Sequence, residues 1–218
     1  MYLIFCDYDG TLSDKKDNFF IKDNVKNFIN EFKKKNPIFI VTGREEKFIK
    51  RLAKGLEPTG WILENGAIFI YNNQRILNVD DDWFQVREDV VKFLEANKVK
   101  FSLGEVIIYV DEASKYFDVL NKVSNAKIEW NRNNLMILPK NIDKGSSILK
   151  FIRRFNLNGK IVVIGDGEND LSMFKVADIK VAVKNAVDVL KYNADFITDK
   201  EDGEGVVEFL RFLSSFSK

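Results

Sequence analysis

The chain has 218 residues, 45% of them hydrophobic and 31% charged, which is typical of a soluble globular protein and excludes a disordered one. With 34 basic and 33 acidic residues, no apolar run of membrane-spanning length and no signal peptide, we expect a cytoplasmic protein without a nucleic-acid or membrane partner. The absence of histidine and the single cysteine exclude serine–histidine triads, histidine-ligated metals and cysteine-based zinc sites.

The first ten residues combine a strand with two carboxylates. An apolar run of strand length stops at Asp7 and Asp9, and Gly10 then breaks the regular structure. A chain that turns at Gly10 can aim both carboxylates into one small space, where they repel unless a cation lies between them or one holds a proton. The pattern indicates a metal site, an acid/base pair or both, and the plainer interpretation is a solvated turn.

Helices and strands alternate over the following residues. The sequence predicts a helix with its apolar face over 21–32 and Asp23 as its cap, a buried strand at 38–41, a helix at 48–53 closed by Gly55, a strand at 61–63 and a hairpin around 72–73. Continuous apolar strands separated by helices are typical of a parallel sheet that is covered on both faces.

Between Asp80 and Lys140 the order changes, because each of two helical faces is followed by two strand-like runs. The helical faces lie at 84–94 and 113–120, and the strand-like runs at 99–103, 105–110, 127–130 and 134–138. This αββαββ order predicts an inserted α+β cap domain over 80–140. The core domain is then formed by 1–79 and 141–218, with hinges at the two junctions.

The alternation resumes in the last third of the chain. We expect a helix at 148–155, a strand at 160–164, a short helix at 171–174, a strand at 179–183, a helix at 187–190, a strand at 196–197 and a last helix at 206–213. The fold class is therefore α/β, with a Rossmann-like parallel sheet as its core. Ligands bind at the carboxyl ends of such strands, and Asp7, Asp9, Thr42 and Asp166 all follow predicted strands.

The carboxylates at these strand ends suit a cation and a phosphate. Asp166 and Asp170 lie in a glycine-rich turn, and with Asp7 and Asp9 they can surround a hard cation such as Mg²⁺. A cation in that position lets a carboxylate attack phosphorus and form an aspartyl phosphate.

Donors for the phosphate are also present. Thr42 offers a hydroxyl and Gly43 an unhindered backbone N–H, while Lys144 at a predicted helix start can complete the charge balance. A solvated lysine is the plainer interpretation of Lys144.

Four short motifs, in order, resemble those of the haloacid dehalogenase (HAD) superfamily phosphatases. They are Asp-Tyr-Asp-Gly-Thr-Leu at 7–12, Val-Thr-Gly-Arg at 41–44, Lys144 and Gly-Asp-Gly-Glu-Asn-Asp at 165–170. The position of the insert resembles the C2B-capped branch, which includes Cof-type, trehalose-phosphate, sucrose-phosphate and archaeal phosphoglycolate phosphatases. The resemblance covers the whole chain.

The resemblance implies a role for each motif residue. Asp7 is the expected nucleophile, and Asp9 the general acid for the leaving alcohol and then the base for water. Mg²⁺ is expected to be held by Asp7, the backbone carbonyl of Asp9 and Asp166, with Asp170 ligating it or its waters. The expected substrate and phosphate contacts come from Thr42, Gly43, Arg44, Lys144 and Asn169.

The expected function is a Mg²⁺-dependent phosphatase for a small phosphorylated metabolite, with a sugar phosphate such as trehalose 6-phosphate as the leading substrate. The alternatives are a phosphoglycolate phosphatase, a phosphomannomutase-like phosphomutase and a non-catalytic phospho-aspartate switch. In the cap, Tyr109, Trp130 and Arg132 are candidates to face the cleft, with cap core or surface as the plainer interpretation. We expect a monomer or a small homo-oligomer.

Overall fold

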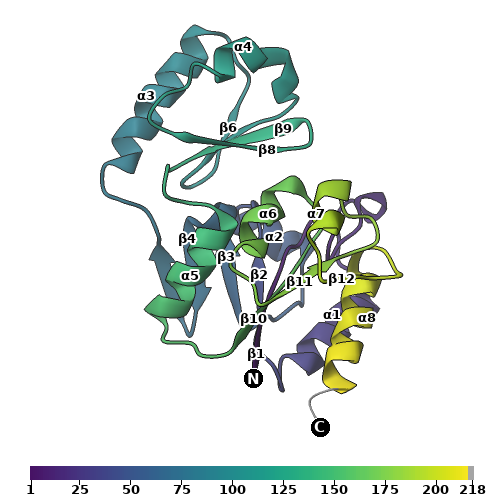
Figure 1. Ribbon diagram of the computed structural model, residues 1–218. Helices are drawn as coiled ribbons and strands as arrows, with labels where there is room; N and C mark the ends of the chain where they lie inside the picture. The colour runs from purple at the N-terminus through teal and green to yellow at the C-terminus, as the bar shows by residue number, and fades with distance from the viewer. Residues whose placement is uncertain (216–218) are drawn as a thin grey trace.

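A computed structural model describes residues 1–215, without the side chain of Lys15. The chain forms an eight-stranded sheet and a separate four-stranded sheet, and the smaller sheet lies above one end of the larger (Figure 1). In the part of the chain that the structure describes, no helix has both the length and the apolar character needed to cross a membrane.

The larger sheet has the strand order β12-β11-β10-β1-β2-β3-β4-β5. Its strands are β1 (Tyr2–Cys6), β2 (Ile38–Val41), β3 (Gly60–Leu63), β4 (Ile68–Tyr71), β5 (Gln74–Leu77), β10 (Lys160–Gly165), β11 (Ile179–Ala182) and β12 (Phe196–Ile197). All neighbours from β12 to β3 are parallel, and β4 and β5 extend the sheet as an antiparallel hairpin. The predicted parallel α/β core is confirmed, with this antiparallel edge.

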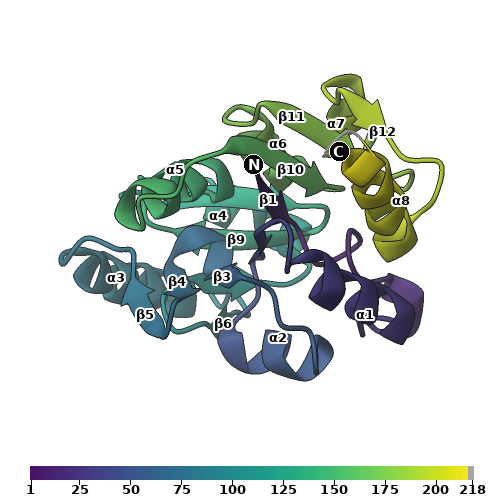
Figure 2. The same cartoon turned by 90° about the horizontal axis from the view of Figure 1, so that it is seen from below.

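Helices cover both faces of the larger sheet, as the continuous apolar strands predict. They are α1 (Asp23–Phe32), α2 (Glu46–Leu52), α5 (Lys144–Arg154), α6 (Leu171–Phe174), α7 (Asp188–Tyr192) and α8 (Asp202–Ser215). α1 and α8 pack together on one face, and α5 and α6 pack together on the other (Figure 2).

One aromatic cluster fixes α5 on the sheet. Phe151 of α5 contacts Phe39 of β2 with ring centroids 5.1 Å apart, and Phe39 stacks on Phe5 of β1 at 4.9 Å. Aromatic contacts of this kind add to the stabilisation from buried apolar area. The first residue of α5, Lys144, is thereby held at the carboxyl end of the sheet.

The smaller sheet and its two helices form the cap. In chain order its elements are α3 (Trp83–Ala96), β6 (Ser102–Leu103), β7 (Ile108–Val110), α4 (Phe117–Leu120), β8 (Lys127–Asn131) and β9 (Asn134–Leu138), and the antiparallel sheet order is β6-β7-β9-β8. A second apolar cluster, which includes Leu94, Ile108, Leu120 and Ile137, fills the space between sheet and helices. The inserted cap sheet of the predicted fold class is confirmed, whereas the boundaries at 80 and 140 stay a prediction.

Two local predictions differ from the structure. The strands expected at 99–103 and 105–110 shrink to β6 and β7. The backbone N–H groups of Glu105, Val106 and Ile107 donate to the carboxylate of Glu64 and not to a strand, and the Val99 N–H donates to the Leu94 carbonyl in the last turn of α3. Asp23 is the first residue of α1 and not its cap, and its carboxylate accepts instead from the ammonium of Lys26.

Candidate active site

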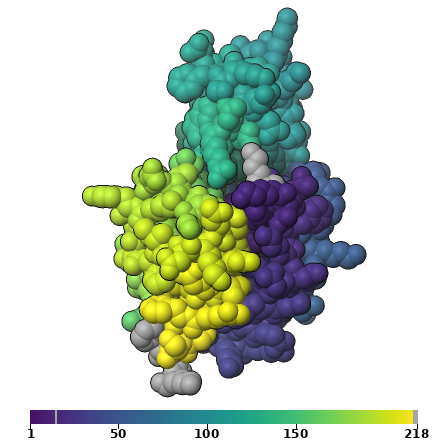
Figure 3. All heavy atoms as spheres, turned by 90° about the vertical axis from the view of Figure 1, so that its right-hand side faces the viewer, coloured from purple at the N-terminus to yellow at the C-terminus, as the bar shows by residue number. Residues whose placement is uncertain are grey.

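The candidate active site lies where three adjacent parallel strands end. Asp7 follows β1 directly, Thr42 follows β2 and Asp166 follows β10. Because β1 lies between β2 and β10, the carboxyl ends of these strands meet at one edge of the sheet. The cap stands over this end of the core, which the N-terminal and C-terminal segments build together (Figure 3).

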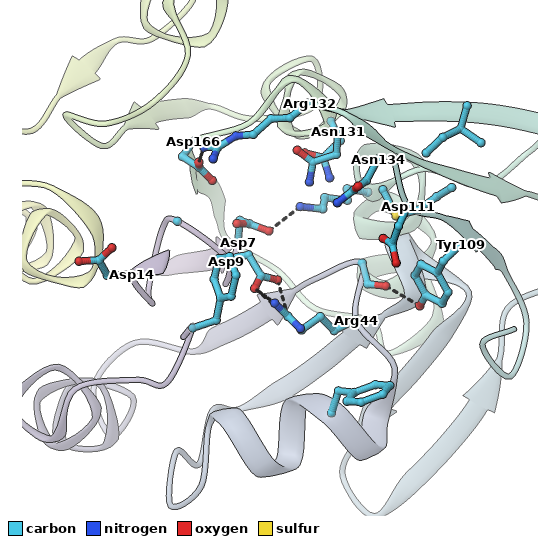
Figure 4. Close-up of a pocket in the computed structure, with 18 of the residues that line it drawn as sticks. Asp7, Asp9, Asp14, Arg44, Tyr109, Asp111, Asn131, Arg132, Asn134 and Asp166 are labelled. Atoms are coloured by element: carbon cyan, nitrogen blue, oxygen red, sulfur yellow. Dashed lines mark hydrogen bonds and ion pairs between the residues drawn. The ribbon is translucent and has the colours of Figure 1, made fainter. Parts of the chain in front are cut away.

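A cleft of about 680 Å³ separates the sheet edge from the cap. Of the predicted site residues, its lining includes Asp7, Asp9, Gly43, Arg44, Lys144, Asp166 and Asn169, many of which are labelled in Figure 4. The two that are not among the described lining residues, Thr42 and Asp170, are fully buried. The sequence-predicted residues are therefore brought together, while their individual roles stay predictions.

Lys144 is a buried cation between two carboxylates. Its ammonium donates to Asp7 Oδ1 at 2.5 Å and to Asp170 Oδ1 at 2.7 Å, and its side chain is 1% exposed. Burial by itself lowers the pKa of a lysine, but Asp170 and Asp7 outweigh it and raise the pKa of Lys144 above its ordinary value. The interpretation of Lys144 as a solvated surface lysine is therefore wrong.

The local sequence fixes the start of α5. The carboxylate of Asp143 accepts from the Ser146 N–H, and the Ser146 hydroxyl accepts from the Asp143 N–H, which forms a capping box. A Cβ on Gly145 would lie 1.9 Å from the carbonyl oxygen of Ser172, so only glycine allows α5 to approach α6 this closely. These contacts determine where the Lys144 side chain enters the site.

Three buried carboxylates form a group that fits a metal ion. One oxygen from each of Asp7, Asp166 and Asp170 lies within 4.8 Å of the others. Burial raises the pKa of Asp7 above its ordinary range, and it raises the pKa of Asp166 to about 7, with Asp170 adding to both shifts. Oxygen donors alone favour a hard cation such as Mg²⁺ over a soft one, and a cation there would relieve the repulsion.

Gly10 lies close to the carboxylate of Asp166, one member of this group. A Cβ at Gly10 would lie 2.6 Å from Asp166 Oδ2, and the backbone has a φ of 79°, which glycine adopts without strain. The Thr11 hydroxyl donates to Asp166 Oδ1 at 3.1 Å. The turn after β1 therefore leaves room for the Asp166 carboxylate and helps to orient it.

Asp9 lies outside the group of three carboxylates and is paired with Arg44. The Arg44 Nε lies 2.7 and 2.9 Å from the two carboxylate oxygens of Asp9, and Nη2 lies 2.6 Å from Oδ1. The guanidinium also lies over the ring of Phe19 at 4.9 Å. The side chain of Asp9 is thus held by Arg44 (Figure 4) and is not one of the three carboxylates that group together.

Residues around the second motif connect the core to the cap. The Thr42 hydroxyl oxygen accepts from the Arg44 N–H at 3.2 Å, and the Gly43 carbonyl accepts from the Tyr109 hydroxyl at 2.7 Å. Burial raises the pKa of Tyr109 above its ordinary range, with Glu64 the next contribution, so it remains a neutral donor. Tyr109 therefore joins β7 of the cap to the phosphate-binding turn that the sequence predicts.

The other two cap candidates differ in position. Arg132 lines the cleft, and its Nη2 lies 3.2 Å from Asp166 Oδ2. Trp130 is not among the described lining residues, and its ring packs at 6.1 Å from that of Phe117 within the cap.

Sequence reasoning assigned no role to several residues that the structure brings to the site. The Asn65 amide donates to Glu129 Oε2 at 2.8 Å and so joins the core to β8. Asn65 and Glu64 follow β3 directly, in the same way as the motif aspartates follow their strands, and this is the signal that finds them. The sequence has no such signal for Glu129 or Thr11, apart from the site residues that lie near them along the chain.

The comparisons with known proteins agree with this geometry. The family model described as haloacid dehalogenase-like hydrolase matches residues 4–128 and 107–210. A phosphoglycolate phosphatase of Sulfurisphaera tokodaii is 50% identical over 208 residues, which cover 95% of this chain and 92% of that protein. Phosphoglycolate phosphatase 2 of Saccharolobus solfataricus is 45% identical and covers 95% of this chain and 90% of that protein.

Solved structures show the same fold at lower identity. A crystal structure from Thermoplasma acidophilum has a TM-score of 0.80 at 22% identity and covers 98% of both chains. A sugar phosphatase of HAD subclass IIB has a TM-score of 0.79 at 21% identity and covers 98% of this chain and 99% of that chain. Cap and core are therefore both part of the shared fold.

Proposed function

The chain belongs to the haloacid dehalogenase-like hydrolases and is a phosphatase of that family, and from this premise we propose that its substrate is phosphoglycolate. The observation that carries the proposal is the 50% identity to the Sulfurisphaera phosphoglycolate phosphatase over 95% of this chain. The relatives favour this alternative over the sugar phosphate that leads the expectation from the sequence.

The first proposed step is the transfer of the phosphoryl group to Asp7. Lys144 engages Asp7 Oδ1, which leaves Oδ2 to attack phosphorus in line with the leaving oxygen. As the new bond to phosphorus forms, the bond from phosphorus to the glycolate oxygen breaks. Asp9 gives its proton to that oxygen, so glycolate leaves with a neutral hydroxyl group in place of an alkoxide.

The second proposed step is the hydrolysis of the aspartyl phosphate. Asp9, now a carboxylate, takes a proton from a water that attacks phosphorus, and inorganic phosphate leaves as the Asp7 carboxylate is restored. Mg²⁺ held by Asp7, Asp166 and Asp170 would neutralise the charge of the phosphoryl oxygens. Lys144, the Thr42 hydroxyl and the Gly43 N–H are the proposed protein donors to the same oxygens.

Phosphate release from phosphoglycolate with Mg²⁺ tests the proposal. We expect the Asp7→Asn variant to lose roughly 10³-fold or more in kcat/KM, because it lacks the nucleophile. Asp14→Asn is the matched control, since Asp14 lines the same cleft outside the group of three carboxylates. Comparable activity in wild type and Asp7→Asn would refute the mechanism.

The same assay separates the remaining alternatives. A phosphomutase would transfer the phosphoryl group within a sugar phosphate and would be stimulated by a sugar bisphosphate. A phospho-aspartate switch would keep a stable phosphorylated Asp7 after acyl-phosphate treatment and release no phosphate. Steady release of phosphate, with phosphoglycolate preferred over trehalose 6-phosphate, is the result that we expect.

A further inference from the structure

Two arginines reach the cleft among its described lining residues, Arg44 from the core and Arg132 from the cap. Two nitrogens of Arg44 are engaged with Asp9, and its plane is also fixed over Phe19. Arg132 makes a single contact, 3.2 Å from Asp166, and its side chain is 54% exposed. Of the two guanidinium groups, that of Arg132 is less engaged with the protein and has more donors to offer a substrate.

The backbone at Arg132 is unusual for its residue type. Arg132 follows β8 in the tight turn to β9, and its φ of 55° lies in the left-handed region that favours glycine and asparagine. An arginine there has a conformational cost that a smaller residue would avoid. Its neighbours Asn131 and Asn134 also line the cleft, so the tip of this hairpin faces the site (Figure 4).

The present partner of Arg132 belongs to the group that fits a cation. When a cation binds the carboxylate of Asp166, the guanidinium of Arg132 no longer contacts Oδ2. A planar guanidinium then has a fork of donors that matches a carboxylate, the group at the far end of phosphoglycolate.

The rest of the cleft wall disfavours a carboxylate. Its other charged residues are mostly acidic, namely Asp14, Glu45, Asp111, Glu201 and Asp202. The other lysine besides Lys144, Lys16, is 81% exposed and lies 3.9 Å from Glu201. A cleft of about 680 Å³ is also far larger than a two-carbon phosphate ester, so a cap residue must contact the substrate to position it.

From these observations we infer that Arg132 determines specificity by binding the carboxylate of the substrate while the phosphoryl group lies at Asp7. Without a cation, Arg132 occupies Asp166, and a bound cation releases it to the substrate. The inference rests on the proposed phosphoglycolate phosphatase function.

The test compares ligands with and without the carboxylate. Arg132→Asn removes the guanidinium and keeps a residue that tolerates the left-handed backbone. We expect kcat/KM for phosphoglycolate to fall roughly 10- to 100-fold, the loss expected for hydrogen bonds to a charged group, with most of the change in KM. With p-nitrophenyl phosphate, which has no carboxylate, kcat/KM should change by less than about 3-fold.

A binding measurement supports the assay without turnover. 3-Phosphonopropionate replaces the bridging oxygen of phosphoglycolate by a methylene, and propylphosphonate lacks the carboxylate. Calorimetry with Mg²⁺ should show that wild type prefers 3-phosphonopropionate and that Arg132→Asn loses this preference, while the Kd for Mg²⁺ does not rise. Asn133→Ala, in the same turn but outside the described cleft lining, is the control and should keep the preference.

The outcomes separate the two proposals. If wild type hydrolyses phosphoglycolate no better than p-nitrophenyl phosphate, the proposed function fails and the role of Arg132 fails with it. If wild type prefers phosphoglycolate and Arg132→Asn keeps the same preference, the function stands and the role of Arg132 is overturned.

Discussion

Glu64 of the core holds Val106 of the cap, because Glu64 Oε2 accepts the Val106 N–H at 2.9 Å. The same carboxylate accepts the N–H groups of Glu105 and Ile107, so three successive donors converge on one buried side chain. On the other side, the indole N–H of Trp83 donates to the Val106 carbonyl. This contact attaches the cap to the core independently of the two chain junctions.

Glu64→Gln should destabilise the protein. The amide has one acceptor oxygen in place of two and turns its NH₂ group toward a backbone donor, so at least one buried N–H loses its partner. We expect a loss of about 1–3 kcal/mol in the free energy of unfolding, measured by urea denaturation. Glu105→Gln, which weakens only the exposed contact with Arg75, should cost less than about 1 kcal/mol. Equal losses in both variants would contradict this account.

Lys144→Met should affect stability and metal affinity in opposite directions. Without its ammonium, Asp7 and Asp170 are buried together and uncompensated, so we expect a loss of about 3–5 kcal/mol in the absence of a cation. Mg²⁺ should recover more stability in this variant than in wild type, since it replaces the missing charge. Thermal unfolding with and without Mg²⁺ measures both effects.

Lys150→Met on the same helix is the control for Lys144→Met. Lys150 makes only an exposed contact with the Asn141 carbonyl, and its replacement should leave the response to Mg²⁺ unchanged. A Lys144→Met variant with the same response to Mg²⁺ as wild type would show that Lys144 does not compete with the cation.

Arg44→Ala should slow the reaction with every phosphomonoester by a similar factor. Its guanidinium orients the carboxylate of Asp9, which in the proposed mechanism acts on the leaving oxygen whatever the substrate. We expect kcat to fall roughly 10- to 100-fold for both phosphoglycolate and p-nitrophenyl phosphate, with the ratio between them preserved. Arg51→Ala is the control, since Arg51 is exposed and lies over the ring of Phe48. A selective loss with phosphoglycolate would instead assign Arg44 to substrate recognition.

Glu129 should make stability fall as the pH rises. Burial raises its pKa from an ordinary value of 4.5 to about 7, with Lys127 and Lys144 opposing the shift and Asp143 and Asp170 adding to it. Because the folded state binds the proton more tightly, this contribution is full below about pH 4.5 and is lost as the pH rises through about 7.

Glu129→Gln removes this titration and keeps an oxygen that accepts from Asn65. At pH 8 we expect the variant to be more stable than wild type by about 1–3 kcal/mol, and at pH 5 the difference should be small. Urea denaturation at both pH values gives the comparison, with Glu88→Gln as the exposed control. A difference that does not change with pH would show that Glu129 titrates in its ordinary range.

The sequence predicted the convergence of Asp7, Thr42 and Asp166 because that convergence follows from topology. Apolar runs that end in polar residues identify the strand ends, and parallel strands bring their carboxyl ends to one edge. It did not predict the contact of Glu64 with residues 105–107, because backbone donors leave no pattern in the side chains that carry them. The same contact explains why β7 begins only at Ile108.

The sequence did not predict the pairing of Arg44 with Asp9 either. Val-Thr-Gly-Arg marks Arg44 as a site residue, but its contact depends on a side-chain conformation that Phe19 and Asp9 determine together. The cap order αββαββ was read correctly because its apolar periodicities are local. The sequence left the substrate open between a sugar phosphate and phosphoglycolate, since no periodicity reports on the chemistry of a small ligand, and the relatives favour the second.

The place of β1 in the sheet bears on how the protein is made. Tyr2 pairs with Lys160 and Cys6 with Ile164, so the strand that precedes Asp7 leaves the ribosome well before its β10 neighbour. The contacts of the cap sheet all lie within 102–138 and are complete before then. Because local contacts form faster than distant ones, we expect a nascent chain to organise its cap while the catalytic centre is still unassembled.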